Sequence, residues 1–301
     1  MSVLSREPRE GILALWLLLP AMLAIGAVAA FPLGQSLWMS LHRVELAFPG
    51  PRTFVGVENY LEALRSSDFW KSVWITVYFT VVSVALELAL GLTGAVLLNE
   101  EFRGRQLLRS LVLIPWAMLT LSTALMWFWI YNPTYGILNA LLLRIGVLET
   151  PVVWLGDPVW AMPAVILADV WKTTPFMTLL LLAGLQPIPW TMYEAAAVDG
   201  ASRWQVFWYV VLPLLRPALL VAVILRSLQA FKVFDMIFVL TSGGPADATL
   251  VLALYTYQQA FRYFHVGYGS ALAWIITLAT LVMVILYLRA LQASAAVEEI
   301  A

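Results

Sequence analysis

Six long apolar segments constrain this chain more than any other feature of its sequence. They cover residues 11–41, 72–98, 110–131, 160–185, 208–240 and 267–288. Each is long enough to supply a helix of about 20 residues that crosses a bilayer. Only 12% of the 301 residues are charged and 62% are hydrophobic, which leaves too few charged side chains to cover a water-soluble surface. The sequence therefore predicts an all-α membrane protein, with six transmembrane helices in a single domain that spans 1–301.

Charge and composition also narrow the classes of function. The 17 basic and 18 acidic residues give a net charge of −1, so the chain offers no basic surface to a nucleic acid. It has no cysteine, and its two histidines, His42 and His265, fall in expected loops. A zinc site or a serine–histidine relay would have little to be built from. We therefore expect no catalytic residue, no metal ligand and no cofactor in this chain.

The lysines exclude one source of energy. A P-loop for ATP requires a glycine directly before its lysine. The three lysines follow Trp70, Trp171 and Phe231 instead. If the chain takes part in ATP-driven work, another subunit must hydrolyse the ATP.

Basic residues give a modest indication of orientation. With the N-terminus in the cytoplasm, the shorter inner segments carry seven arginines and the longer outer segments carry six basic residues. The inner set is Arg6, Arg9, Arg103, Arg105, Arg109, Arg203 and Arg289. Positive charge is enriched on cytoplasmic loops, so both termini are expected there. The first apolar run is longer than the core of a signal peptide, which favours an uncleaved anchor over a cleaved signal.

The segment 187–206 has the pattern of a structured loop. Its two prolines end the preceding helix because proline cannot donate a backbone hydrogen bond. Thr191 and Glu194 predict a capping box that opens a short helix, and Gly200 suits the left-handed turn that would end it. Ser202 with the glutamine three residues later predicts a second capping box. On these residues alone, a solvated connector and a surface that docks a partner are equally good interpretations.

A longer motif runs through this loop. Glu194-Ala195-Ala196 is followed at fixed spacing by Gly200, Val210 and Leu212-Pro213. The pattern resembles the EAA signature of permeases from binding-protein-dependent ABC importers, although the family usually has isoleucine where Val210 stands. In that family the loop is a coupling helix that docks on a cytoplasmic ATPase. The resemblance implies an ATPase-coupling role for Glu194, Ala195, Ala196, Asp199 and Gly200.

Other segments extend the resemblance over nearly the whole chain. Residues 56–60, 132–139, 154–158, 171–176 and 241–245 are similar to sugar-type permeases, and the last is typical of the first permease in maltose-type importers. The large extra outer domain of the maltose subunit is absent. Residues 190–265 are most similar to the permease of trehalose importers, and glycerol-phosphate permeases are close relatives.

The resemblance implies a set of partners and a location. A second permease subunit would complete a heterodimer, two copies of a cytoplasmic ATPase would bind ATP and Mg²⁺, and an extracytoplasmic binding protein or lipoprotein would deliver a sugar. The location would be the plasma or inner membrane of a prokaryote.

Ionisable residues within the apolar segments mark candidate sites, because they are costly in lipid. Asp169 and Lys172 lie three residues apart, hence on one face of a helix, and a mutual ion pair is the favoured interpretation. Thr173 and Thr174 precede Pro175, and hydroxyls beside a helix interrupted by proline suit a neutral polyol.

The fifth apolar segment carries a polar stripe that should not face lipid. Arg226, Gln229, Lys232 and Asp235 follow one another at spacings of three, and they should face either the partner permease, as salt bridges, or the pathway. By resemblance to maltose-type permeases, the substrate-pathway candidates are Ser122, Thr173, Phe176, Arg226, Gln229 and Lys232.

Two alternatives from other classes remain. A proton-coupled secondary transporter would use Glu87 or Asp169 as its proton carrier, although a single carboxyl such as Glu87 is more often packed and hydrogen-bonded. A membrane enzyme is the weaker alternative, because no nucleophile–base pair is visible. Within the ABC class, trehalose is the expected substrate, and glycerol phosphate or a maltose-type oligosaccharide is the alternative.

Overall fold

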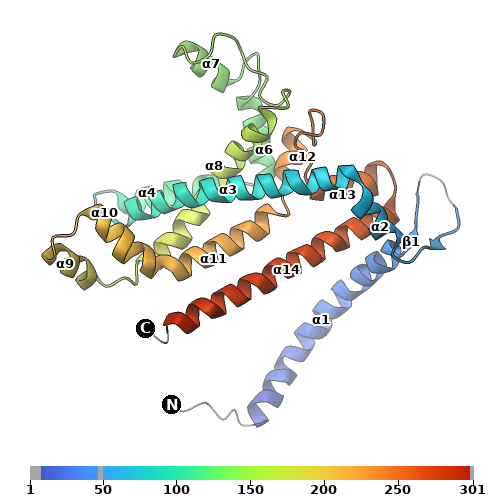
Figure 1. Ribbon diagram of the computed structural model, residues 1–301, viewed down its shortest axis with the longest axis horizontal. Helices are drawn as coiled ribbons and strands as arrows, with labels where there is room; N and C mark the ends of the chain where they lie inside the picture. Colours follow the sequence, from blue (N-terminus) through green and yellow to red (C-terminus); the bar gives the residue numbers. More distant parts are fainter. Residues whose placement is uncertain (1–7, 47–49, 299–301) are drawn as a thin grey trace. The chain divides into compact units, whose positions relative to one another are not determined.

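A computed structural model describes residues 8–46 and 50–298 of the chain, and nearly all of its regular structure is helical (Figure 1). Arg6 and both chain ends, which entered the prediction of orientation, lie outside the described residues. The chain divides into two compact units. One contains the described residues up to Arg65 together with Thr256–Ile275, and the other contains Ser66–Tyr255 together with the described residues from Ile276 onward.

The first unit joins a long helix to a small hairpin. Its elements are α1 (Pro8–Ser40), β1 (His42–Arg43), β2 (Thr53–Phe54), α2 (Glu58–Arg65), the π-helical turn η2 (Gln258–Arg262) and the first part of α14 (Val266–Glu298). The two strands are antiparallel, with His42 opposite Phe54. His42 therefore lies in a strand, not in the loop that the sequence predicted. The amide of Asn59 at the start of α2 donates to the carbonyls of Ser40 (2.7 Å) and His42 (3.1 Å), which fixes α2 against the hairpin.

The second unit contains most of the helices. In chain order they are α3 (Ser67–Asn99), α4 (Arg105–Val112), α5 (Ile114–Ala117), α6 (Thr120–Ile130), α7 (Ile137–Arg144), α8 (Ala161–Leu185), α9 (Trp190–Val198), α10 (Arg203–Val206), the π-helical turn η1 (Phe207–Val211), α11 (Leu212–Ala230) and α12 (Asp235–Leu240). The short helix α13 (Leu252–Tyr257) leads into the first unit.

Within residues 8–46 and 50–298, five helical stretches are long and apolar enough to cross a membrane, and they overlap five of the six expected segments. They are Trp16–Ser40, Ser67–Asn99, Ala161–Leu185, Arg203–Ala230 and Val266–Arg289. The expected third segment, 110–131, is not one continuous helix. It is divided between Arg105–Ala117 and Thr120–Ile130, which meet at 90°. If this bent pair is counted as one, the described part of the chain has six candidate spans.

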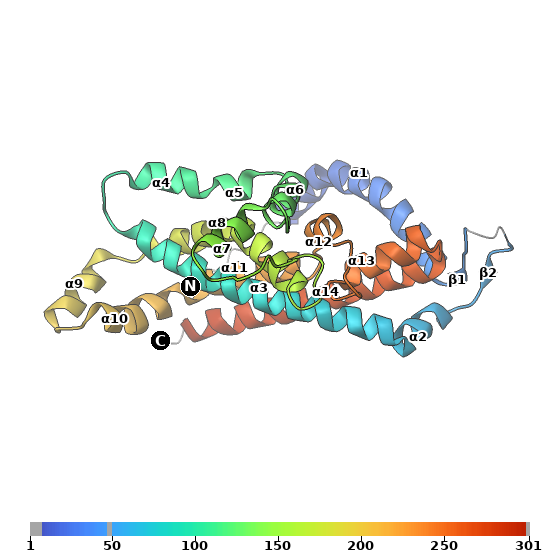
Figure 2. The same ribbon diagram turned by 90° about the horizontal axis from the view of Figure 1, so that it is seen from above.

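Helices α3, α8 and α11 pack against one another and form the core of the second unit (Figures 1 and 2). Glycines let them approach closely: a Cβ atom on Gly91 of α3 would lie 2.6 Å from the side chain of Met177 on α8. Small residues have this role in membrane helix packing, where backbones must come near one another. A hydrophobic cluster that includes Leu98, Leu185 and Leu215 closes one end of the three-helix core.

Candidate functional site

A buried group of charged side chains joins α3, α8 and α11. The guanidinium of Arg226 on α11 donates through Nε to one oxygen of Glu87 on α3, and through Nη2 to the other oxygen at 2.8 Å. The same Nη2 donates to Asp169 on α8. The side chains of Arg226, Glu87 and Asp169 are 4%, 0% and 9% exposed. We call these three residues the charge cluster.

Thr173 belongs to the surroundings of this cluster. Its hydroxyl lies 2.7 Å from Oε1 of Glu87 and 2.6 Å from the backbone oxygen of Asp169, so its one proton is shared between two acceptors. Buried polar groups that lack partners are costly in a membrane. Most polar groups of the cluster have hydrogen-bond partners within this chain. A substrate would have to displace these bonds to reach Thr173 or Arg226.

Lys172 does not form the ion pair with Asp169 that the sequence predicted. Its ammonium donates to the backbone oxygen of Met118 at 2.6 Å and makes a longer contact of 3.4 Å with that of Trp116. Both carbonyls lie where α5 gives way to α6, and Met118 and Leu119 have extended backbone angles there. Carbonyls at the end of a helix have no partner within that helix, which explains why a buried ammonium is drawn to them.

An aromatic contact from the next turn of α8 also packs against the break between α5 and α6. The ring of Phe176 stacks on that of Trp116, with centroids 5.6 Å apart and planes inclined by 13°. Residues four apart share a face of a helix, so Lys172 and Phe176 both face the broken third segment. Trp116 is a member of this contact that the sequence analysis missed. Pro115 beside it was the available signal, since proline interrupts helices.

The remaining pathway candidates are exposed in this chain. Ser122 lies on α6, Gln229 near the end of α11, and Lys232 just beyond it. No side-chain hydrogen bond or ion pair connects these three to the charge cluster within the described residues. The structure thus brings Thr173 and Arg226 together through Glu87, and it leaves the other polar candidates free to face solvent, lipid or a partner.

The polar stripe expected in the fifth segment does not exist as one helical face. Helix α11 ends at Ala230, and Asp235 opens the separate helix α12. Arg226 points into its own chain and is therefore unavailable for a salt bridge to another subunit. The periodicity of three predicted a common face only because the apolar run gave no sign that the helix ended.

The loop between α8 and α10 has the expected form, with one difference. Helix α8 ends at Leu185, α9 follows, and Gly200 has a φ of 75° in the left-handed region. Ser202 and Gln205 form the predicted capping box. Thr191 and Glu194 do not, because Pro189 is the N-cap of α9 and makes no side-chain cap bond. The helix starts at Trp190, one residue before Thr191. The hydroxyl of Thr191 therefore lies inside the first turn and not at the N-cap.

The five coupling candidates lie on or directly after α9. Glu194 and Ala195 are exposed, Ala196 is half-buried, and Asp199 and Gly200 are exposed at its C-terminal end. Tyr193, which the sequence analysis passed over, packs against the hydrophobic cluster of the three-helix core. The segment therefore presents one side to its own chain and the other to solvent.

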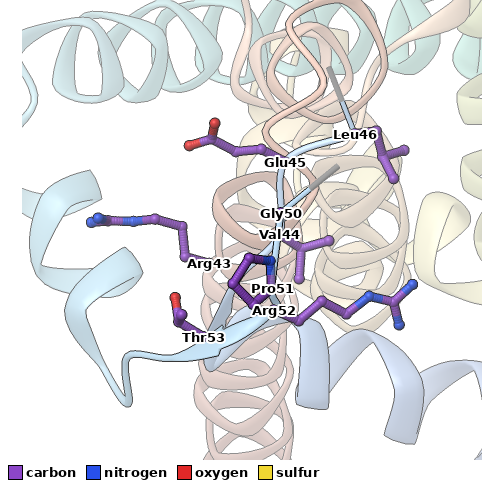
Figure 3. A pocket seen from close by; sticks show the side chains of 8 residues that line it. All are labelled: Arg43, Val44, Glu45, Leu46, Gly50, Pro51, Arg52 and Thr53. Atoms are coloured by element: carbon purple, nitrogen blue, oxygen red, sulfur yellow. The ribbon is translucent and has the colours of Figure 1, made fainter. Parts of the chain in front are cut away.

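A pocket of about 410 Å³ lies on the hairpin of the first unit (Figure 3). Figure 3 shows Arg43 and Arg52 directed to opposite sides of it. Of the eight residues that line it, only Val44 is buried. We assign this open surface no part in the candidate site.

Comparison with known proteins places these features in a family. Residues 87–295 match the model of the binding-protein-dependent transport system inner membrane component. The chain is 46% identical to the trehalose/maltose transport system permease protein MalF of Thermococcus litoralis, over 93% of this chain and 94% of that one. It is 38% identical to the trehalose transport system permease protein SugA of Mycobacterium tuberculosis, over 95% and 91% of the two chains.

A solved structure supports the same fold. A chain of a bacterial ABC transporter involved in the import of the polysaccharide alginate superposes with a TM-score of 0.80 at 22% identity, covering 95% of this chain and 96% of that one. Together with the match over residues 87–295, this shows that the chain is a multi-pass membrane protein and belongs to the inner membrane components of binding-protein-dependent transport systems, the permeases of ABC importers.

Proposed function

We propose that this chain is one permease subunit of an ATP-driven importer for a sugar, with trehalose as the first candidate. The observation that carries the choice of substrate is the 46% identity to a trehalose/maltose permease along almost the full length of both chains. The identity to a second trehalose permease supports it. Glycerol phosphate and maltose-type oligosaccharides are the alternatives to be tested.

The charge cluster and the neighbouring Lys172 are together consistent with a neutral substrate. Arg226 is paired with two carboxylates, and Lys172 with two carbonyls. The four ionisable groups are two acids and two bases, so their formal charges cancel. A neutral sugar needs hydrogen-bond donors and acceptors but no net charge, and exposed amides and hydroxyls such as those of Gln229 and Ser122 can supply them.

Energy would come from partner subunits. The sequence has no P-loop lysine, and α9 presents Glu194 and Ala195 to solvent. Two copies of a cytoplasmic ATPase, holding ATP and Mg²⁺, would bind this surface of the permease and that of a second permease subunit. An extracytoplasmic binding protein would deliver the sugar, and both termini of this chain would lie in the cytoplasm.

Proton coupling through Glu87 or Asp169 is disfavoured by their contacts. Each carboxylate is paired with Arg226, and their side chains are 0% and 9% exposed. A proton carrier must exchange with water on each side of the membrane in turn. Carboxylates held by a buried guanidinium are poorly suited to that exchange.

The test is uptake of labelled trehalose, maltose and glycerol 3-phosphate by a strain that lacks the gene for this chain. Supplying the chain should restore uptake of trehalose and leave glycerol 3-phosphate unaffected, and an empty vector is the control. Restored uptake of glycerol 3-phosphate alone would contradict the proposed substrate class.

A further inference from the structure

Helix α9 has one side that faces its own chain. Of its nine residues, only Tyr193 and Ala196 are half-buried, and the rest are exposed. The two are three residues apart and therefore share a face. Tyr193 packs against a hydrophobic cluster whose buried members include Leu98 of α3 and Leu185 of α8. Tyr193 is therefore the large side chain through which α9 contacts the three-helix core.

The ring of Tyr193 sits in a defined position. Trp190, one turn earlier, stacks on it with centroids 5.3 Å apart and planes inclined by 28°. Burial, and after it the carboxylate of Glu100, raises the pKa of Tyr193, so the phenol stays neutral at physiological pH. Glu100 is the C-cap of α3. These interactions place the ring beside the end of that helix.

The same end of α3 is also bound by two arginines of α4. Arg109 donates to the backbone oxygen of Leu98 at 2.8 Å. Arg105 makes longer contacts of 3.4 Å with the backbone oxygens of Asn99 and Glu100. Cations stabilise the C-terminal end of a helix, where carbonyls lack partners. The end of α3 thus connects α9 with α4, which is the first part of the broken third segment.

The opposite side of α9 is open to a partner. Glu194 and Ala195 are exposed, and Val198 is 87% exposed. A protein bound there can move the membrane helices only if α9 moves with them as one body. A surface helix of nine residues has little rigidity of its own, since short helices owe their stability to packing.

We propose that Tyr193 is the positioning residue that fixes α9 to the end of α3, so that movement of a bound ATPase reaches the membrane helices. The inference rests on the proposed docking of an ATPase on α9. The ring is the active part: it fills the space between Trp190 and the hydrophobic cluster. The hydroxyl is not required for this role.

The experiment compares Tyr193→Ala and Tyr193→Phe in the complete transporter, with Tyr209→Ala as a matched control. Tyr209 is 79% exposed, so its removal leaves the core intact. Three quantities are measured: the amount of ATPase that copurifies, the ratio of sugar-stimulated to basal ATP hydrolysis, and sugar uptake in proteoliposomes. Tyr193→Ala should retain the ATPase but lose stimulation and at least about tenfold of the uptake. Tyr193→Phe and Tyr209→Ala should stay within about twofold of the parent.

Several outcomes would overturn the proposal. Normal stimulation in Tyr193→Ala would show that the ring is dispensable. Loss of the ATPase from that variant would place Tyr193 in the docking contact itself, and failure of Tyr193→Phe would shift the role to the hydroxyl. If the alanine variant does not assemble, Tyr193→Val is measured in its place, and failure of both would make Tyr193 a folding residue. A parent complex without sugar-stimulated ATPase would instead refute the proposed function.

Discussion

Replacing Arg226 by methionine tests the charge cluster directly. The change removes the guanidinium that contacts both Glu87 and Asp169, and it leaves two carboxylates whose side chains are 0% and 9% exposed. Removing one partner of a buried ion pair typically destabilises a protein by about 3–5 kcal/mol, because the other charge remains buried without compensation. At about 1.4 kcal/mol per factor of ten, the ratio of folded to unfolded protein should fall by roughly 100-fold or more.

The assay is equilibrium unfolding of the purified chain in mixed detergent micelles, with Lys71→Met as the control. Lys71 and Asp247 form an ion pair at 3.8 Å, but their side chains are 50% and 63% exposed. An exposed pair of this kind contributes about 0–1 kcal/mol. Neutralising both acids in the Arg226→Met background, with Glu87→Gln and Asp169→Asn, should recover most of the lost stability. If Arg226→Met is no less stable than Lys71→Met, the cluster does not hold the three helices together.

Three further predictions concern the loop, the topology and the pathway. Gly200→Val should abolish the coupling of sugar binding to ATP hydrolysis, whereas Gly200→Asn should be largely tolerated. Nothing lies within 4 Å of the position that a Cβ atom would take, but a φ of 75° is unfavourable for a β-branched residue. Full coupling in purified Gly200→Val would contradict the docking role. Because the chain has no cysteine, Val198→Cys in the free permease should react with an impermeant thiol reagent only from the cytoplasm, and Ser242→Cys only from outside. Labelling of both from one side would overturn the six-span assignment, and labelling from the exchanged sides would overturn the orientation. Gln229→Ala should reduce sugar uptake without affecting assembly or basal ATP hydrolysis, since this amide is exposed and has no side-chain hydrogen bond in the described chain. Unchanged uptake would show that Gln229 does not belong to the pathway.

The long helices were predictable because hydropathy over about 20 residues reports a membrane span. The ends of the apolar runs were less informative. The fifth run continues through Phe231, Val233 and Phe234, so it concealed the end of α11 at Ala230. Likewise, the third run gave no sign of its break at Met118 beyond the proline three residues earlier. Hydropathy measures transfer into lipid and is insensitive to a change in helix direction.

The local motifs in the loop at 187–206 were largely predictable, whereas the charge cluster was not. Gly200 and the capping box of Ser202 with Gln205 depend on neighbouring residues, and both formed as expected. The partner of Glu87 is 139 residues away in the chain. Spacing along one helix favoured Lys172 as the partner of Asp169, because the approach of α11 to α8 is a tertiary contact that no local pattern encodes.

The measurement that bears most directly on the account is sugar uptake into proteoliposomes that contain this chain with its partner permease and ATPase. Trehalose should accumulate when ATP is enclosed and the binding protein is present outside, and a protonophore should have no effect. An imposed proton gradient without ATP should drive no uptake. Accumulation driven by the gradient alone, without ATP or the binding protein, would contradict the assignment of this chain as the permease of an ATP-driven sugar importer.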